Sequence, residues 1–140
     1  MSDVLSCESW PSNLAWRWVS AATAEALHDE QIAEHGGGEG LRDPGLLESA
    51  MARPRNLVAY GNPDLALLAA SYAFGVARNH PFIDGNKRTA LLVCLLFIEK
   101  NGGRIDAMDA ELLAIFLDLA AGELGEEELA DWLRERVSPA

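Results

Sequence analysis

Two segments of the chain are apolar on nearly every face of a helix, and a short polar loop separates them. The first is Leu65–Asn79, whose helix is expected to start at Pro63–Asp64, and the second is Lys87–Asn101. A helix that is apolar all round is normally buried, so the pattern predicts a central pair of core helices. Pro81 ends the first helix, because the residue before a proline avoids helical backbone angles. Gly102 and Gly103 close the second helix.

Less apolar segments between breakers predict four further helices. Ser20 and Asp43 are good helix N-caps, and Pro44 suits the first position of a helix. The glycines of residues 36–40 are expected to end the first of these helices. The further helices are residues 20–35, residues 43–52, residues 109–121 with Asp109 as the cap, and an amphipathic helix after Gly125 with Leu129, Trp132, Leu133 and Val137 facing inward. The predicted fold class is therefore all-α, a bundle of about six helices.

One segment between the predicted helices has breakers at both ends and apolar residues in its middle. It begins at Pro54 and ends at Asn62. The residues in its middle are Leu57, Val58, Ala59 and Tyr60. This pattern predicts a short flap or hairpin, and a plain loop between two helices is the alternative.

The length of 140 residues, of which 49% are hydrophobic, allows one domain with one core. Residues 1–15 show no periodicity and predict a mobile leader, so that the domain covers residues 16–137. Cys7 and Cys94 do not suggest a disulfide framework. The longest apolar run, Ala90–Ile98, has nine residues and is too short to span a membrane. Without a secretory signal at the start, these features favour a cytoplasmic protein.

The charge of the chain is strongly negative but unevenly distributed. The net charge of -11 argues against a nucleic acid as the main partner, because phosphate backbones bind basic surfaces. Residues 105–140 hold ten acidic and two basic side chains, a net of -8. Residues 53–88 hold five basic and two acidic side chains, a net of +3. A small cationic zone on an acidic protein suits a small anionic ligand.

The loop between the two core helices has the composition of a phosphate-binding site. It reads His-Pro-Phe-Ile-Asp-Gly-Asn-Lys-Arg and is called the motif loop below (residues 80–88). Gly85 would let a ligand approach the backbone closely, and Asn86 is expected to cap the next helix, whose first amides would face an anion. Lys87 and Arg88 are good partners for phosphate oxygens.

Two further residues of the motif loop bring the chemistry of a transfer reaction. A carboxylate beside a phosphate is repelled unless a divalent cation joins them, so Asp84 implies Mg²⁺. His80 is the group in the loop that can take up a proton near neutral pH. Phe82 and Ile83 are expected to anchor the loop in the core. Taken singly, each polar residue could be a helix cap, a solvated cation or a structural histidine, but their order in one loop favours a phosphate site.

The motif loop resembles the motif of the Fic/Doc superfamily, His-x-Phe-x-(Asp/Glu/Asn)-(Gly/Ala)-Asn-(Gly/Lys)-Arg, at every fixed position. The likeness extends outside the loop, through Leu27–Asp29, Arg42–Ala50 and Thr89–Leu92, and covers about residues 16–137. The resemblance implies a compact helical Fic/Doc domain. It also implies that His80 is the base, that Asp84 holds Mg²⁺, and that residues 85–88 cradle the phosphates.

Two positions favour the Doc (death-on-curing) branch of the superfamily. Fic enzymes that transfer AMP usually have glycine where this chain has Lys87, and a second arginine where it has Leu91. The Doc resemblance implies a toxin that phosphorylates a serine or threonine of a protein with Mg-ATP. Translation factor Tu is the target described for Doc enzymes, and its modification arrests translation. A Fic-type adenylyltransferase and a non-catalytic interaction module remain the alternatives.

The resemblance also implies partners. Fic proteins carry a segment before the motif that lines up the target, and the predicted flap would take this place. Many Fic proteins inhibit themselves through a helix with Ser/Thr-x-x-x-Glu-Gly/Asn. In this chain the Glu followed by Gly or Asn is Glu39, and His35 stands four residues before it. A separate Phd-like antitoxin is therefore expected to restrain the protein in trans.

Two histidines of the first predicted helix are expected to be structural. His28 and His35 are seven residues apart, which separates them by about 10 Å along a helix axis. This separation is too large for both to bind one zinc ion.

Overall fold

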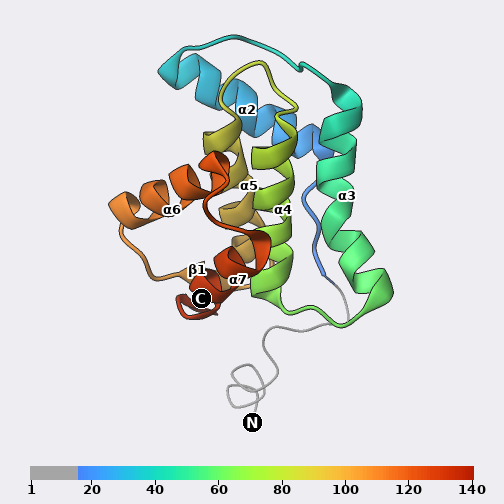
Figure 1. Ribbon diagram of the computed structural model, residues 1–140, viewed down its shortest axis with the longest axis vertical. Coiled ribbons are helices and arrows are strands. Elements are labelled where there is room, and N and C mark those ends of the chain that lie inside the picture. The colour runs from blue at the N-terminus through green and yellow to red at the C-terminus, as the bar shows by residue number, and fades with distance from the viewer. Residues whose placement is uncertain (1–15) are drawn as a thin grey trace.

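Six helices and one pair of short strands make up the part of the chain that the structure describes, residues 16–140 of the computed structural model (Figure 1). The helices are α2 (Ala21–His35), α3 (Pro44–Tyr60), α4 (Leu65–Asn79), α5 (Asn86–Lys100), α6 (Asp109–Ala121) and α7 (Glu126–Arg134). Strand β1 (Gly103–Ile105) pairs antiparallel with β2 (Val137–Pro139). The all-α prediction is confirmed. The expected leader, residues 1–15, lies outside the described residues.

Helix α4 is the centre of the molecule and packs against α3, α5 and α7. Eleven of its 15 residues are buried, and most of them are small or aliphatic. Gly75 lets α3 approach closely, because a Cβ there would lie 3.0 Å from Cα of Ala50. Helix α5 is the second core helix and buries Cys94, where desolvation raises the pKa of the thiol to about 12. The predicted core pair is confirmed.

The predicted helix starts at Ser20, Asp43 and Asp64 are confirmed by side-chain caps. Ser20 Oγ accepts a hydrogen bond from Thr23 N at 3.1 Å. Asp43 Oδ1 accepts from the backbone of α3 at 3.2 Å, and Asp64 Oδ1 accepts from that of α4 at 3.0 Å. Such caps are each worth about 1 kcal/mol. Gly36 ends α2 with φ of 79°, as the glycine cluster predicted.

The predicted flap is wrong, because residues 57–60 are the last turn of α3. Pro54 does not break this helix; it is buried among the core-facing residues of α3. Leu57 and Val58 continue the same apolar side and pack against the core. Tertiary packing of this side therefore outweighs the local cost of a proline inside a helix. The extended element of the fold is instead the β1–β2 pair.

Two smaller boundaries also differ from the prediction. Met108, and not Asp109, is the N-cap of α6, and its N–H donates to Glu111 Oε1 at 3.0 Å. Asp109 lies in the first helical turn, where a negative charge suits the helix dipole. Val137 packs against the core as predicted, but it does so from β2, since α7 ends at Arg134.

Among the described residues, no helix is long and apolar enough to cross a membrane.

Candidate functional site

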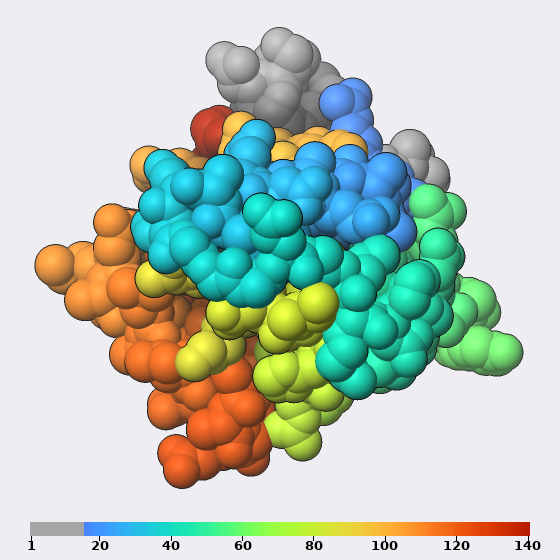
Figure 2. Space-filling model, turned by 90° about the horizontal axis from the view of Figure 1, so that it is seen from above, coloured from blue at the N-terminus to red at the C-terminus, as the bar shows by residue number. Residues whose placement is uncertain are grey.

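The motif loop lies at one end of the core pair, where α4 ends and α5 begins (Figure 1). Figure 2 views this end and shows the loop in yellow between α2 in blue, the following segment in cyan and α6 in orange. Phe82 is 1% exposed and anchors the loop as expected. Ile83 is 59% exposed, so the expectation that it also anchors the loop is wrong. One buried ring therefore ties the centre of the loop to the core.

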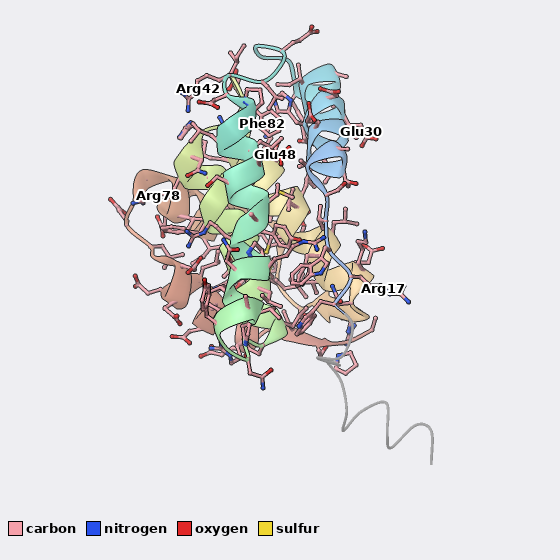
Figure 3. The ribbon with its side chains drawn as sticks, turned by 90° about the vertical axis from the view of Figure 1, so that its right-hand side faces the viewer. Arg17, Glu30, Arg42, Glu48, Arg78 and Phe82 are labelled. Carbon is pink, nitrogen blue, oxygen red and sulfur yellow. The ribbon has the colours of Figure 1, made fainter. Side chains whose placement is uncertain are left out.

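His80 ends α4 with a left-handed backbone, φ 50° and ψ 55°. This conformation is costly for a residue other than glycine. Arg42 holds it in place, since its Nε donates to the His80 carbonyl at 2.7 Å and its Nη2 donates to the Asn79 carbonyl at 2.8 Å. Figure 3 labels Arg42 and Phe82 at the same end of the molecule. The imidazole of His80 is thereby carried on a fixed backbone while its side chain stays exposed.

Asn86 is not the helix cap that its position in the sequence suggests. Gly85 is the N-cap of α5, and the Asn86 side chain turns back into the loop. Its Oδ1 accepts from Phe82 N at 3.0 Å, and its Nδ2 donates to Phe82 O at 3.0 Å. These two bonds fix which end of the amide is the donor. The same Nδ2 reaches Nδ1 of His80 at 3.3 Å, so a neutral His80 with this contact carries its proton on Nε2.

The Asp84 carboxylate stands exposed beside the start of α5. Its Oδ1 accepts from Gly85 N at 2.8 Å, and its Oδ2 faces Gly38 N at 3.4 Å. Gly85 has φ of 77°, which favours glycine, and a Cβ there would lie 3.5 Å from the His28 ring. The backbone conformation thus explains the glycine without any ligand.

Lys87 and Arg88 are exposed on the first turn of α5. Neither forms an ion pair with a carboxylate among the described residues. The first amides of a helix lack partners within the helix and attract anions, and these two side chains add positive charge at the same place. An anion of phosphate size is the ligand that this end of α5 suits best.

The structure brings the six predicted site residues of the motif loop together around one hollow of about 380 Å³. Its lining residues are Gln31, Ile32, Gly36, His80, Ile83, Asp84, Gly85, Asn86, Lys87 and Arg88. Leu91 lies beyond the two cations and is half-buried, lining a smaller apolar hollow of about 230 Å³ with residues of α6. A histidine, a carboxylate and the cationic start of a helix thus share one opening, with an apolar hollow next to it.

The residues of the predicted flap are not part of this site. Leu57 and Tyr60 line a different hollow of about 520 Å³, where α3 meets the start of α4. The length of α4, about 22 Å at 1.5 Å per residue, separates that hollow from His80. Figure 1 shows the two ends of α4 on opposite sides of the molecule.

Sequence reasoning missed the segment that covers the motif loop, residues 36–42. In this cover segment the Gly40 carbonyl accepts a hydrogen bond from Ile83 N at 3.1 Å, and Leu41 pairs with Phe82 in an isolated β-bridge. Arg42 belongs to it. The pattern of the glycines predicts the end of a helix, and nothing in it shows which loop they meet. The partners of the cover segment are about forty residues later in the chain.

His28, expected to be structural, is buried and touches the motif loop through Phe82 and Asp84. The signal that could have found it is the spacing of the buried side of α2, Ala24, His28 and Ile32. A histidine on such a stripe needs a polar partner in the core.

Comparisons with known proteins find one family. The profile of the Fic/DOC family matches residues 18–98, which contain α2, α3, α4, the motif loop and most of α5. The chain is 40% identical over 126 residues to Protein kinase doc of Escherichia phage P1, a match that covers 89% of this chain and 98% of that protein. It is 44% identical over 75 residues to Toxin Doc of Mycolicibacterium smegmatis, covering 51% of this chain and 57% of that protein.

Proposed function

The chain belongs to the Fic/Doc family, and on this premise we propose that it is a protein kinase that transfers the γ-phosphate of ATP to a serine or threonine hydroxyl of a protein target. The observation that carries the proposal is the single hollow shared by His80, Asp84 and the N-terminus of α5. The name of the phage P1 relative, which the chain matches over most of its length, supports kinase chemistry.

The phosphates of ATP have a suitable place at the start of α5. The free amides of the first turn, with Lys87 and Arg88, would bind the phosphate oxygens. Gly85 and Asn86 shape the backbone that presents these amides. Such a site stabilises the charge of a transferring phosphoryl group mainly by position and electrostatics.

Asp84 fits a magnesium ion that arrives with the nucleotide. The described residues contain no cluster of three or more metal-binding side chains, so a metal held by protein alone is not supported. Mg²⁺ in nucleotide enzymes is typically bound by one or two carboxylates together with phosphate oxygens and water, and one exposed carboxylate beside the phosphate site meets that need. When bound, Mg²⁺ would neutralise phosphate charge.

His80 would act as the general base for the target hydroxyl. It takes the hydroxyl proton as the hydroxyl oxygen bonds to the γ-phosphorus, and the bond from that phosphorus to the β–γ bridging oxygen breaks to release ADP. A neutral imidazole accepts this proton on the nitrogen that lacks one, which is Nδ1 while Asn86 donates to it. The contact of 3.3 Å is long for a hydrogen bond, so we expect it to break, or the ring to turn over, when the target binds.

Transfer of phosphate is favoured over transfer of AMP by the residues beside the hollow. Lys87 places a long cationic side chain where glycine would leave room for a deeper nucleotide. Leu91 offers an apolar side chain where a second arginine would bind the far phosphates. Without the room that glycine would leave and without the second arginine, the α-phosphorus lacks the placement that in-line attack requires.

The experiment is a transfer assay with ATP labelled at either the α or the γ position and purified translation factor Tu as the acceptor. We expect label on the acceptor from the γ position alone, and none with the His80→Ala variant. Label from the α position would replace the kinase proposal by an adenylyltransferase. If the protein is intact and neither label is transferred, either the acceptor or the activity itself is refuted. Repeating the assay with other acceptor proteins separates these two outcomes.

We further propose that the protein is the toxin of a toxin–antitoxin pair that arrests translation in the cytoplasm. Support comes from the name of the Mycolicibacterium smegmatis relative, Toxin Doc. His35 is the last residue of α2, and Glu39 lies in the cover segment, so no helix contains both. Within the described residues, the chain therefore lacks an inhibitory helix of the self-restrained Fic type. An antitoxin acting in trans, of the Phd kind, would supply the restraint.

A further inference from the structure

His28 joins α2 to the motif loop from inside the core. Its side chain is 1% exposed and lies on the buried stripe of α2. The imidazole stacks on the Phe82 ring with centroids 3.9 Å apart and planes 6° apart. Its Nε2 lies 2.7 Å from the carbonyl oxygen of Asp84. The ring therefore meets both the anchor of the loop and the backbone of its carboxylate residue.

The hydrogen bond to Asp84 sets the tautomer of His28. A carbonyl oxygen can only accept, so Nε2 must be the donor. Nδ1 is buried without a hydrogen-bond partner among the described residues and lies 3.7 Å from Oδ1 of the exposed Asp29. In the neutral ring, Nδ1 carries no proton and donates nothing. His28 thus acts as a single, aimed N–H donor.

This donor orients the peptide bond between Asp84 and Gly85. The peptide is planar and trans, so its carbonyl and its N–H point in opposite directions. With the carbonyl held by His28, the Gly85 N–H points the opposite way along the peptide, and it donates to Asp84 Oδ1 at 2.8 Å. The bond from His28 therefore orients the peptide, and the peptide in turn holds one oxygen of the carboxylate.

We propose that His28 is a positioning residue of the phosphate site, which acts through the Asp84–Gly85 peptide. The proposal rests on the proposed function, since it assigns the carboxylate and the start of α5 to nucleotide and metal binding. If His28 were only a packing residue, any side chain that fills the same space would serve equally well. The directed N–H is the feature that packing alone does not require.

Three substitutions separate the donor from the packing. In His28→Gln the amide nitrogen takes the place of Nε2, so the donor to Asp84 is kept. In His28→Asn the amide nitrogen takes the place of Nδ1, so a donor of the same kind is aimed elsewhere. His28→Phe keeps a ring against Phe82 and has no donor. His35→Gln, at the exposed end of the same helix, is the matched control.

We expect γ-phosphate transfer at saturating ATP to fall about 10–100-fold in the Asn and Phe variants, a range typical for the loss of a group that orients a metal ligand. The Gln variant should stay within about threefold of the parent chain. The Mg²⁺ concentration for half-maximal rate should rise in the Asn variant and stay near the parent value in the Gln variant. In ¹⁵N NMR spectra without nucleotide, the Gly85 amide signal should shift with Asn or Phe and return with Gln.

Equal activity and an unchanged Gly85 signal in all three variants would overturn the proposal. An equal loss in all three that follows the loss of folded protein in thermal unfolding would overturn it too, because His28 would then be a packing residue. The Gln and Asn pair decides the question even if the Phe variant does not fold. A parent chain without γ-transfer would count against the proposed function alone, and the Gly85 signal would then decide the role of His28.

Discussion

At the scale of single residues, two side chains hold the motif loop in addition to the backbone bonds from the cover segment. Asn86 bonds both backbone groups of Phe82 and reaches the His80 ring. Arg42 bonds the carbonyls of Asn79 and His80. Arg42 therefore fixes the backbone of His80, while the contact of Asn86 with the ring is long at 3.3 Å. A side chain carried on a fixed backbone has less freedom to lose when a target binds.

His80→Ala should reduce phosphate transfer by about 10²–10⁴-fold, the usual contribution of a general base. The stability should change by less than about 0.5 kcal/mol, because the side chain is exposed and makes one long contact. Initial rates and urea unfolding measure the two effects. His35→Ala is the control with a second exposed histidine. Activity of the His80 variant within about threefold of the parent would exclude the base role.

The residues of the motif loop that share one hollow could be predicted from their types, but the internal contacts of the loop could not. An asparagine before a helix has the same sequence signature whether it caps the helix or binds the preceding loop. Asn86 does the second, because Gly85 already takes the cap position with a left-handed backbone. The contacts of His28 and Arg42 could not be predicted for another reason, since their partners follow 56 and 38 residues later in the chain.

At the scale of helices, caps and core patterns were predictable, and the path of the chain through Pro54 was not. Each predicted helix exists, and three of the expected caps are present. The flap prediction is wrong because the apolar side that Leu57 and Val58 continue decides the structure there, and the proline does not. The burial of that side against the rest of the core is a tertiary effect, which local signals do not contain.

One ion pair joins the start of α4 to the end of α7. Arg134 donates to both carboxylate oxygens of Asp64, from Nε at 2.6 Å and from Nη2 at 3.1 Å. The hydrogen bonds from Arg134 hold the pKa of Asp64 below its usual value of 3.8, although partial burial opposes the shift. Both side chains are 44% exposed, so solvent screens the pair and its contribution should be about 0.5–1 kcal/mol.

Asp64→Asn tests this pair without removing the cap, because asparagine caps helices about as well as aspartate. The folded-state pKa of Asp64 is lowered, so its contribution is complete above the unfolded value and is lost as the pH falls through the folded value. We expect the variant to be less stable by about 0.5–1 kcal/mol at pH 7. The difference should begin to shrink once the pH falls below 3.8. Urea unfolding at pH 7 and pH 3 measures it, and a difference that is the same at both pH values would contradict the assignment.

At the scale of the whole molecule, the acidic and the cationic side chains belong to different elements. The acidic side chains of residues 105–140 belong mostly to α6 and α7, while the cationic pair of the motif loop stands at the start of α5. This distribution of charge suits a small anion better than a nucleic acid. The long-range arrangement of α6 beside the loop, seen in Figure 2, could not be predicted from local patterns.

Expression of the chain without an antitoxin should arrest bacterial growth, because the described residues contain no inhibitory helix of the Fic type. The His80→Ala variant should permit normal growth at the same level of soluble protein. Growth curves from an inducible plasmid, with quantification of the soluble protein, provide the measurement. Normal growth with intact, soluble parent protein would refute the toxin role in that host.

The packing of α7 on α4 has a consequence for the order in which the protein is made. Leu129, Ala130 and Leu133 are fully buried, and α7 packs directly on α4. These residues follow His80 by about fifty positions, so α4 and the motif loop leave the ribosome before α7 does. Until α7 packs on α4, the side of α4 that it covers stays in contact with solvent. We therefore expect the motif loop to reach its final arrangement only after α7 has joined the core, well after the residues of the loop themselves have been synthesised.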